Sequence, residues 1–386
     1  MKQTAQEMLE NIITFWKGMR DNEFGGYYGL MDIDLNLNKT ADKGCILNSR
    51  ILWFFSEAAR VLNRSDLLDE ARHAYRFLTE RCIDRERGGI YWSVTHDGQP
   101  CDTTKHTYNQ AFAVYALSAY YEASGDREAL DLANSIFALI EDRCTDENGY
   151  GEAYDHSFVP IVNDKLSENN IIADKTMNTL LHVFEAYSGL YRAAKNPVVA
   201  EKMRSILDTF INRVYNPKLR RQEVFFDSQW NSLIDLTSYG HDIESSWLIE
   251  WGCTMLGDAA LSKRISEICS DMTACVYDHA FRDSSLRNEC EAGVENEHRI
   301  WWVQSEAVVG FLNMAQKHPG QIRYITAVED ILKFIEDKLI DKRPGSEWLS
   351  EVMPDGSHTA ERKPIVEQWK CPYHNGRMCL EIMQRV

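Results

Sequence analysis

Several motifs that indicate a bound cofactor are missing from this 386-residue chain. It has no GxGxxG and no GxxxxGK[ST] segment, which would indicate a nucleotide site. It also has no HExxH motif and no CxxC pair, the spacings expected of a zinc site. We therefore predict no cofactor and no metal ion.

Net positive charge and long apolar runs are missing as well. The formal net charge is −17, from 42 Lys and Arg against 59 Asp and Glu. A nucleic-acid groove needs clustered basic residues, so nucleic acid is not an expected partner. No apolar run reaches the length of a membrane span, which argues against a membrane partner. The first residues, MKQTAQEMLENIITFW, mix charges with apolar residues and do not read as a signal peptide.

Proline is scarce, and the ten cysteines are scattered. With nine prolines and no Pro- or Ser-rich linker, residues 1–386 are predicted to form a single domain. Several cysteines fall inside apolar helical stretches, which favours buried thiols in a reducing cytoplasm over a disulfide framework. We therefore expect a cytoplasmic protein.

The chain does contain six segments that resemble one another. Each begins with polar or aromatic residues and continues into an apolar helix, and they recur roughly every 60 to 70 residues, as in a repeat architecture. The six segments are KGCILNSRILWFF (43–55), KHTYNQAFAVYAL (105–117), DKTMNTLLHVFEA (174–186), GHDIESSWLIEW (240–251), WWVQSEAVVGFL (301–312) and CPYHNGRMCLEI (371–382). Helices with polar groups at the same end can direct all of them into one site.

Six ordinary amphipathic helices alternate with these segments. They are predicted over residues 3–19, 66–82, 127–142, 197–214, 259–279 and 323–340, each with one apolar face. The pattern predicts an all-α fold, an (α/α)6 barrel with an outer and an inner ring. The alternative is an open solenoid of helix pairs, but the last repeat carries the densest polar cluster, which favours a closed ring.

Short aromatic, Gly-flanked segments precede five of the inner helices. They are predicted to form brief strands or hairpins over the mouth of the barrel. These segments are 25–29, 88–92, 149–154, 223–227 and 347–351.

Histidines at the helix starts are the first candidates for chemistry. His241 lies three residues before Glu244, close enough on a helix for the carboxylate to orient the imidazole. His374 follows a proline and begins the last helix, with Arg377 one turn further on. His182 lies one turn after Asn178 on an otherwise apolar stretch, where a buried structural histidine is the alternative.

Two charged residues lie in apolar surroundings. Arg50 needs a partner or a ligand oxygen if it is buried, and its forked donors suit an oxyanion. Glu306 lies four residues after Trp302. The alternative for both charges is a structural Arg–Glu pair across the barrel floor.

Aromatic residues at the predicted mouth indicate a sugar ligand, because flat rings stack on the C–H faces of sugars. Core packing is the alternative for each of them. Of the neighbours Trp301 and Trp302, we select Trp302 because it shares a helix face with Glu306. The aromatic candidates are Tyr108, Trp247, Trp302 and Trp369.

The six segments together resemble the N-acylglucosamine 2-epimerase superfamily, and most closely the cellobiose 2-epimerases. The resemblance covers nearly the whole chain. It is carried by ADKGCILNSRILWFF, KHTYNQAFAVYALS, ADKTMNTLLHVFEAY, SYGHDIESSWL, WWVQSEAVVGF and WKCPYHNGRMC. One departure is Asn48, where many disaccharide epimerases have a histidine two residues before the arginine.

The resemblance implies an (α/α)6 barrel that uses no cofactor and inverts C2 of the reducing-end glucose of β-1,4-linked disaccharides. It places His241 and His374 on opposite sides of C2, His182 at ring opening and Arg50 near the carbonyl oxygen. Glu244 would support its histidine. The residues that would line or order the site are Tyr108, Asn178, Trp247, Trp302, Glu306 and Trp369. The implied partner is a disaccharide, and we expect a monomer, with a weak dimer as the alternative.

Three other functions are consistent with the sequence. The first is a monosaccharide 2-epimerase or aldose–ketose isomerase of the same superfamily. The second is a glycoside hydrolase on the same barrel, which needs two carboxylates flanking the scissile bond. The third is a helical-repeat scaffold that binds a partner protein.

Overall fold

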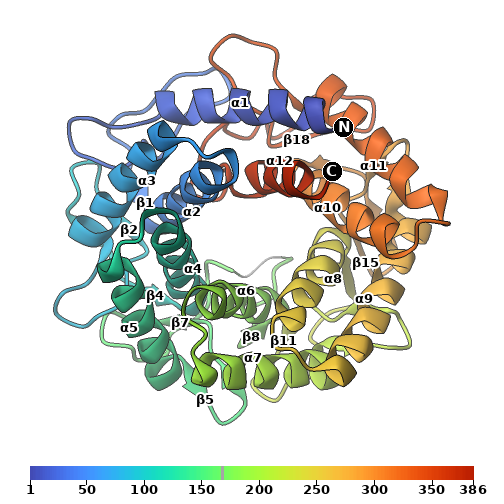
Figure 1. Ribbon diagram of the computed structural model, residues 1–386, viewed down its shortest axis with the longest axis horizontal. Coiled ribbons are helices and arrows are strands. Elements are labelled where there is room, and N and C mark those ends of the chain that lie inside the picture. Colours follow the sequence, from blue (N-terminus) through green and yellow to red (C-terminus); the bar gives the residue numbers. More distant parts are fainter. Residues whose placement is uncertain (167–168) are drawn as a thin grey trace.

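The computed structural model describes residues 1–166 and 169–386. Twelve α-helices in this part of the chain form two concentric rings (Figure 1). The inner ring consists of α2 (Cys45–Leu62), α4 (Thr107–Ser124), α6 (Met177–Ala194), α8 (Tyr239–Thr254), α10 (Trp301–Lys317) and α12 (Tyr373–Arg385). The outer ring consists of α1 (Lys2–Gly18), α3 (Ser65–Phe77), α5 (Arg127–Arg143), α7 (Pro197–Thr209), α9 (Ala259–Ala280) and α11 (Ile322–Phe334). The predicted all-α (α/α)6 barrel is confirmed.

The outer helices bury one face and expose the other. In α3, for example, Leu67, Ala71 and Ala74 are buried at the i, i+4, i+7 spacing of one helix face. Three outer helices continue into five-residue π-helical turns, so that they end close to the predicted residues. These turns are η1 (Leu78–Cys82), η2 (Phe210–Val214) and η3 (Ile335–Leu339).

The inner helices are covered on all sides and pack closely. In α4 every residue from Thr107 to Tyr120 is buried. A Cβ atom placed on Gly376 would lie 2.4 Å from the ring of Phe54, so glycine is required there for α12 to approach α2. Because α12 contacts both α10 and α2, the inner ring is closed and the open solenoid is excluded. No helix in the described part of the chain combines the length and the apolar character needed to cross a membrane.

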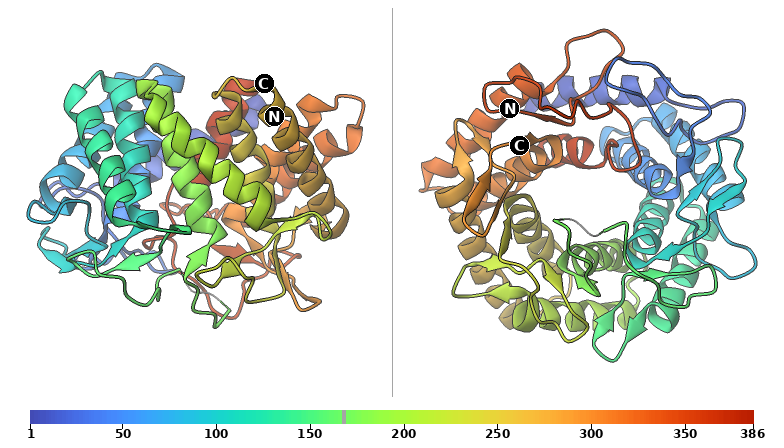
Figure 2. Two further views of the ribbon diagram at one scale, coloured as in Figure 1. Left: turned by 90° about the horizontal axis from the view of Figure 1, so that it is seen from below. Right: turned by 180° about the vertical axis from the view of Figure 1, so that it is seen from behind.

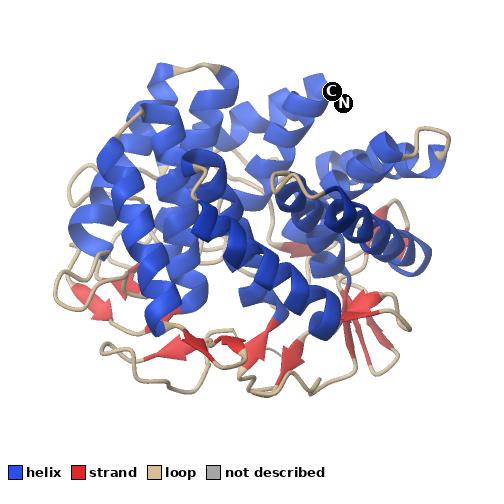
Figure 3. Cartoon of the chain, turned by 60° about the horizontal axis from the view of Figure 1, so that its bottom comes forward, coloured by secondary structure: helices blue, strands red, loops and turns tan. Residues whose placement is uncertain are grey.

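The two ends of the barrel differ. Short turns at one end join the first five inner helices to the outer helices that follow them, whereas the longer connections at the other end carry the strands (Figures 2 and 3). The strands are β1 (Lys43–Gly44), β2 (Ser93–Val94), β3 (Pro100–Asp102), β4 (Lys105–His106), β5 (Thr145–Asp146), β6 (Gly149–Tyr150), β7 (Ala153–Tyr154), β8 (Lys175–Thr176), β9 (Tyr215–Asn216), β10 (Arg221–Gln222), β11 (Phe225–Phe226), β12 (Leu236–Ser238), β13 (Phe281–Arg282), β14 (Ser285–Leu286), β15 (Glu289–Glu291), β16 (Val294–Asn296), β17 (Arg299–Ile300) and β18 (Glu351–Val352). All six inner helices begin at this strand end.

Most of the strands form two-stranded antiparallel ladders, and two sheets have three strands, β1–β2–β3 and β12–β15–β16. The predicted aromatic segments lie in these ladders or in isolated bridges, such as Tyr27 with Arg20 and Trp348 with Ile340. The hairpin of β15 and β16 was not predicted. Its residues, ECEAGVEN (289–296), include three glutamates and no aromatic residue, so it lacks the aromatic pattern of the other repeats.

A buried ion pair recurs where the chain enters an inner helix. In four repeats a lysine just before the inner helix pairs with an acidic residue that follows the preceding outer helix. The pairs are Lys43–Asp21, Lys105–Asp84, Lys175–Asp146 and Lys370–Glu347. Each lysine is almost fully buried, so losing its acidic partner would leave an uncompensated buried charge. These pairs hold the starts of the inner helices in place, and the candidate site lies there.

Candidate active site

A cavity of about 500 Å³ opens at the strand end of the barrel. Its inner wall is formed by the inner helices, and its outer wall by the strand-bearing connections. The inner-helix residues that line it are Arg50, Tyr108, Asn178, His182, His241, Glu244, Trp301, Trp302 and His374. Nine of the eleven residues proposed from the sequence line this cavity: eight on the inner helices and Trp369 just before α12.

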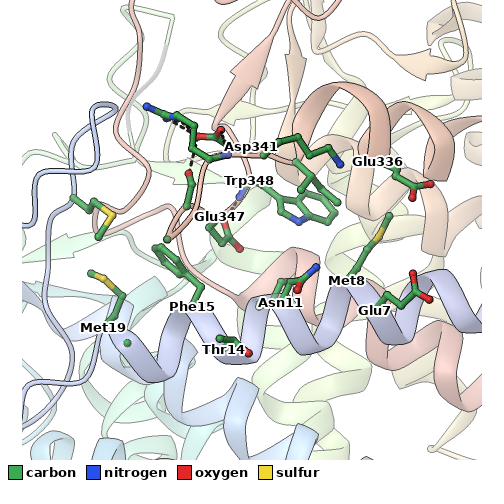
Figure 4. A pocket seen from close by; sticks show the side chains of 18 of the residues that line it. Glu7, Met8, Asn11, Thr14, Phe15, Met19, Glu336, Asp341, Glu347 and Trp348 are labelled. Carbon is green, nitrogen blue, oxygen red and sulfur yellow. Dashed lines mark hydrogen bonds and ion pairs between the residues drawn. The ribbon is translucent and has the colours of Figure 1, made fainter.

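A second cavity, of about 570 Å³, lies on the outside of the ring between α1 and residues 336–348 (Figure 4). It fills the gap between neighbouring outer helices. None of the described residues that line it is a histidine, and none was selected from the sequence. The candidate chemistry is therefore confined to the first cavity.

The inner helices supply the cavity from equivalent positions. The sixth residue is Arg50 in α2, His182 in α6, Glu244 in α8 and Glu306 in α10. The second residue of an inner helix lies one turn nearer the mouth. It is Tyr108 in α4, Asn178 in α6, Trp302 in α10 and His374 in α12. Residues four apart share one helix face, so α6 and α10, which appear in both sets, present two layers of side chains to the barrel axis.

His374 has a carboxylate partner. Its Nδ1 lies 2.7 Å from Oε1 of Glu306. The other oxygen of Glu306 accepts a hydrogen bond of 3.0 Å from Nε1 of Trp247. Glu306 and Trp247 therefore lie beneath the cavity wall and orient His374. This corrects the expectation that Trp247 stacks on the ligand.

His241 has a different partner from the one predicted. Its Nδ1 lies 2.7 Å from the hydroxyl Oγ of Ser238. Glu244 instead accepts a hydrogen bond from Arg377 and lies 3.8 Å from Nδ1 of His374. The prediction that Glu244 supports His241 is wrong, because His241 in the first turn of α8 bends back to the preceding strand. Glu244, one turn later, points to the barrel axis.

The two imidazoles share one indole ring. The ring centroid of Trp302 lies 4.8 Å from that of His241 and 5.5 Å from that of His374. The imidazoles can therefore be no further apart than the sum of these distances. Trp302 can approach α8 closely because Gly240 has no side chain: a Cβ there would lie 2.5 Å from the indole. Trp301 also lines the cavity, with its ring under the ammonium group of Lys370.

His182 is held by a second carboxylate. Its Nδ1 lies 2.8 Å from Oε2 of Glu185, one turn further along α6. Its ring meets those of Tyr108 and Phe112 at centroid distances of 5.0 and 4.9 Å. His182 is thus a fixed ring in the cavity wall rather than an isolated core histidine.

Arg377 joins these carboxylates on the barrel axis. It is 2 % exposed and donates to Glu185 at 2.5 Å, to Glu306 at 2.7 Å and to Glu244. The hydroxyl of Tyr373 donates to the same Glu185. A single guanidinium therefore compensates three buried carboxylates. Glu185 binds His182, Glu306 binds His374, and Glu244 lies beside His374.

Burial and mutual charge shift the titration of this cluster. Burial and the charge of Glu306 raise the pKa of Glu244 to about 7, although Arg377 opposes the shift. For Glu185, burial is outweighed by Arg377 and by hydrogen bonds, and its pKa is lowered. Burial, followed by the charge of Arg377, lowers the pKa of His374 well below its usual value. Burial lowers the pKa of His241 to about 3, so this imidazole is neutral in the free protein.

Arg50 is a buried cation that forms no salt bridge with any residue in the described part of the chain. Its guanidinium lies over the ring of Phe112 at 4.3 Å and donates a hydrogen bond of 2.7 Å to the hydroxyl of Tyr108. Its Nε has no hydrogen-bond partner among the described residues. The alternative of an Arg50–Glu306 pair is wrong, because Glu306 pairs with Arg377. The positive charge of Arg50 is available to a ligand oxygen.

The remaining predicted residues complete the wall. Trp369 meets Tyr108 and Trp92 at ring distances of 5.9 and 5.6 Å, and it lines the cavity. Asn178 lines it too, and its Oδ1 has no partner among the described residues. These groups offer a ring face and a free acceptor to a polar ligand.

Three donors in the cluster have the geometry of a metal site. Atoms of Glu244, Glu306 and His374 lie within 4.8 Å of one another. Both carboxylates already accept hydrogen bonds from Arg377, whose guanidinium supplies the positive charge at this point. A metal ion bound there would have to sit beside that cation.

Four residues of the site were not selected from the sequence: Glu185, Ser238, Tyr373 and Arg377. Glu185 follows His182 by three residues, the same spacing that suggested Glu244 for His241, so a signal was present. Tyr373 and Arg377 lie in the last repeat segment, beside His374. Ser238 precedes the helix and gave no signal.

Asp242 lies next to His241 but faces away from the cavity. Its Oδ1 accepts hydrogen bonds from the backbone and side-chain amides of Gln222, at 2.9 and 3.2 Å. Burial raises its pKa to about 7 from 3.8. A carboxyl group whose pKa is raised in the folded state contributes stability that is present below about pH 4 and is lost as the pH rises through about 7.

We therefore predict a pH-dependent effect of Asp242→Asn. The free energy of unfolding of the wild type, minus that of the variant, should fall by about 2–3 kcal/mol between pH 5 and pH 8. Urea denaturation of both proteins at several pH values measures this difference. The buried histidines are the same in both proteins, so their contributions to the pH dependence cancel. A difference that is constant with pH would contradict the raised pKa.

Fold and site together define an (α/α)6 barrel with three histidines in one cavity. The family model of N-acylglucosamine 2-epimerase (GlcNAc 2-epimerase) matches residues 25–374. A cellobiose 2-epimerase of Eubacterium cellulosolvens is 50% identical over 395 residues, covering 98% of this chain and 97% of that protein. A cellobiose 2-epimerase of Ruminococcus albus is 47% identical and covers 100% of this chain and 98% of its own.

The fold comparison agrees with the sequence comparison. The crystal structure of a sugar epimerase from a ruminal bacterium superposes with a TM-score of 0.97 at 47% identity, covering 99% of this chain and 98% of that one. The chain belongs to the N-acylglucosamine 2-epimerase family. It is therefore an isomerase, of the epimerase kind.

Proposed function

We propose that this enzyme inverts C2 of the reducing-end glucose of β-1,4-linked disaccharides, converting cellobiose to glucosyl-mannose and lactose to epilactose. The observation that carries the proposal is the pair His241 and His374. Both imidazoles line one cavity and contact the ring of Trp302, and each has its Nδ1 bound by a protein group. Among the described residues, neither Nε2 has a hydrogen-bond partner, so both are directed to the substrate.

The reaction needs two proton transfers at one carbon. In the open-chain sugar, one neutral imidazole removes the proton from C2, and the electrons move onto the aldehyde oxygen to give an enediolate. The second imidazole, protonated at that moment, returns a proton to the opposite face of C2. Each histidine therefore acts as base in one direction and as acid in the other.

The enediolate is an anion, and positive groups surround it. Arg50 has no carboxylate partner among the described residues, and its forked donors suit the developing oxyanion. All six inner helices also begin at this end of the barrel, so their positive dipole ends point to the cavity. His182, fixed by Glu185, is the group that we propose for ring opening.

The outer part of the cavity supports a disaccharide substrate. Its polar lining extends beyond the imidazoles to Lys165, Asn288, Glu289, Asn296, His298, Glu351 and Lys363. The volume of about 500 Å³ falls within the range of small-ligand pockets. The two relatives described above, which are named for cellobiose, match this chain over nearly its whole length.

A glycoside hydrolase is less consistent with this geometry. Hydrolysis needs two carboxyl groups on either side of the scissile bond. Glu244 and Glu306 instead accept hydrogen bonds from the same nitrogen of Arg377, and Glu306 is fully buried. They therefore lie side by side, Glu244 in the cavity wall and Glu306 behind it, and cannot flank a substrate bond.

Isotope exchange tests the proposal. We expect that cellobiose incubated with the enzyme in D2O yields glucosyl-mannose with deuterium at C2, measured by NMR and mass spectrometry. The label arises because the proton returned to C2 comes from an imidazole that exchanges with solvent. Product without label at C2 would exclude proton transfer there, free glucose would indicate hydrolysis, and a ketose product would indicate aldose–ketose isomerisation.

We also propose that residues 1–386 act as one domain, as a monomer, in the reducing cytoplasm. All ten cysteines are free thiols. Light scattering of the active enzyme tests the monomer, with a weak dimer as the alternative outcome.

A further inference from the structure

The two imidazoles of the proposed proton-transfer pair have chemically different partners. Nδ1 of His374 faces a carboxylate oxygen of Glu306, whereas Nδ1 of His241 faces the hydroxyl of Ser238, each at 2.7 Å. An ionised carboxylate only accepts hydrogen bonds, but a hydroxyl both donates and accepts. The partner of His374 is therefore a charged acceptor, whereas the partner of His241 is a neutral hydroxyl.

Ser238 lies where it would ordinarily serve the helix. It is the last residue of β12 and the N-cap of α8, a position at which serine usually accepts a hydrogen bond from the first turn. Its side chain makes no such bond here. The hydroxyl is directed instead to the imidazole three residues later, which indicates a role beyond capping.

The backbone holds Ser238 firmly. It pairs in the antiparallel ladder with Glu289 of β15, another residue of the cavity wall, and Ser238 is only 8 % exposed. Its hydroxyl therefore reaches His241 from a fixed strand. Ser238 also lines the cavity, and it connects the strand of the outer wall to the imidazole through its hydrogen bond.

We propose that Ser238 is a positioning residue of the epimerisation: its hydroxyl holds the ring of His241 and follows that ring through both protonation states. The hydroxyl accepts from Nδ1–H both when His241 is the neutral base, with Nε2 free, and when the imidazole carries two protons. Donation by the hydroxyl to Nδ1 would place the remaining proton on Nε2 and leave no base there. Glu306 can only accept, so it keeps the Nδ1 proton of His374 in place and leaves Nε2 as the base. This inference rests on the proposed function.

The surroundings of His241 do not supply an alternative partner. The other ionisable groups that line this cavity come from α2, α4, α6, α8, α12 and the strand-bearing connections. They are Arg50, Tyr108, Lys165, His182, Glu244, Glu289, His298, Glu351, Glu361, Lys363 and His374. Among the described residues, Ser238 is the hydrogen-bond partner of Nδ1 of His241.

The test compares Ser238→Ala with Ser238→Thr, which keeps the hydroxyl. In Ser238→Ala we expect kcat to fall about tenfold with little change in KM, and the pH profile of kcat to shift. In Ser238→Thr we expect most of the lost rate to return. Ser118→Ala is the matched control, because its buried hydroxyl binds only the carbonyl of Val114 within α4.

Deuterium exchange distinguishes a positioning role from a purely structural one, because a purely structural role of Ser238 would not change the ratio of C2 exchange from the two epimers. In D2O, Ser238→Ala should still exchange the C2 proton of the epimer that His374 deprotonates, because His374 can return deuterium to the same face. Exchange from the other epimer, which His241 must deprotonate, should fall with the rate of inversion. The variant should therefore show unequal exchange from the two epimers.

Each result decides between two claims. If the wild-type enzyme shows no C2 exchange, the proposed function itself fails. If the wild type exchanges but Ser238→Ala inverts at the wild-type rate, or loses exchange equally from both epimers, the role of Ser238 is overturned. Failure of Ser238→Thr to recover activity, with an unchanged melting temperature, would overturn it as well.

Discussion

His374→Asn should lower kcat for C2 epimerisation by about 10³-fold while leaving the fold intact. The substitution removes the Nε2 that we propose as base, and general-base catalysis contributes about 10²–10⁴-fold. The asparagine amide can still donate to Glu306, so that no buried carboxylate is left without a partner. The rate is measured by chromatography of cellobiose and glucosyl-mannose, and the fold by circular dichroism.

His318→Asn is the matched control for this variant. His318 follows α10 at the end of the barrel away from the cavity, so its replacement should leave the rate unchanged. If His374→Asn retains near wild-type turnover, the base is another residue and His182 becomes the next candidate. If it loses its melting transition, the loss of activity says nothing about proton transfer, and the milder Glu306→Gln is to be compared instead.

Arg377→Met should lower the free energy of unfolding by about 3–5 kcal/mol, the usual result of removing one partner from a buried ion pair. Arg377 compensates Glu185, Glu244 and Glu306 at once, and methionine leaves all three without a cation. Epimerisation should also be lost, because Glu306 and Glu185 then no longer hold their histidines. Urea denaturation measures the first effect and the sugar assay the second.

The pH dependence of this variant follows from the same charges. Without Arg377 the pKa of Glu185 should no longer be lowered, and the raised pKa values of Glu244 and Glu306 should rise further, so the stability lost should be larger at pH 8 than at pH 5. Arg72→Met, which breaks an exposed pair with Asp69 on α3, should change stability little at either pH. An Arg377→Met protein as stable as the wild type would show that the carboxylates are neutral or hydrated.

Much of the barrel could be predicted because each helix carries its own pattern. The outer helices alternate apolar and charged faces, as in α3, and the inner helices are apolar nearly all round, as in α4. The polar starts of the inner helices placed the site at one end. The hairpin of β15 and β16 was not predicted, since its charged residues show no strand pattern and it is fixed by pairing with β12.

The side-chain partners within the site were harder to predict. The spacing of His241 and Glu244 is the same as that of His182 and Glu185, yet only the second pair forms. The two cases differ because His241 lies in the first turn of its helix, where a preceding strand competes for the ring, whereas His182 lies in the second turn. Spacing along a helix shows which residues can meet, but it does not show which of several possible partners forms the hydrogen bond.

The sequence by itself determined the helices, their order in two rings, the end of the barrel that carries chemistry and most of the residues there. These depend on periodicity and on polar residues at helix starts, which are local properties of the chain. Only the tertiary structure decided that Arg377 joins three carboxylates, that Glu306 rather than Glu244 holds His374, and that Ser238 holds His241. The contacts of Arg377 and Glu306 link helices from different repeats, so their geometry exists only once the ring has closed. The contact of Ser238 with His241 is local, but it depends on the strand β12, which is fixed by pairing with β15.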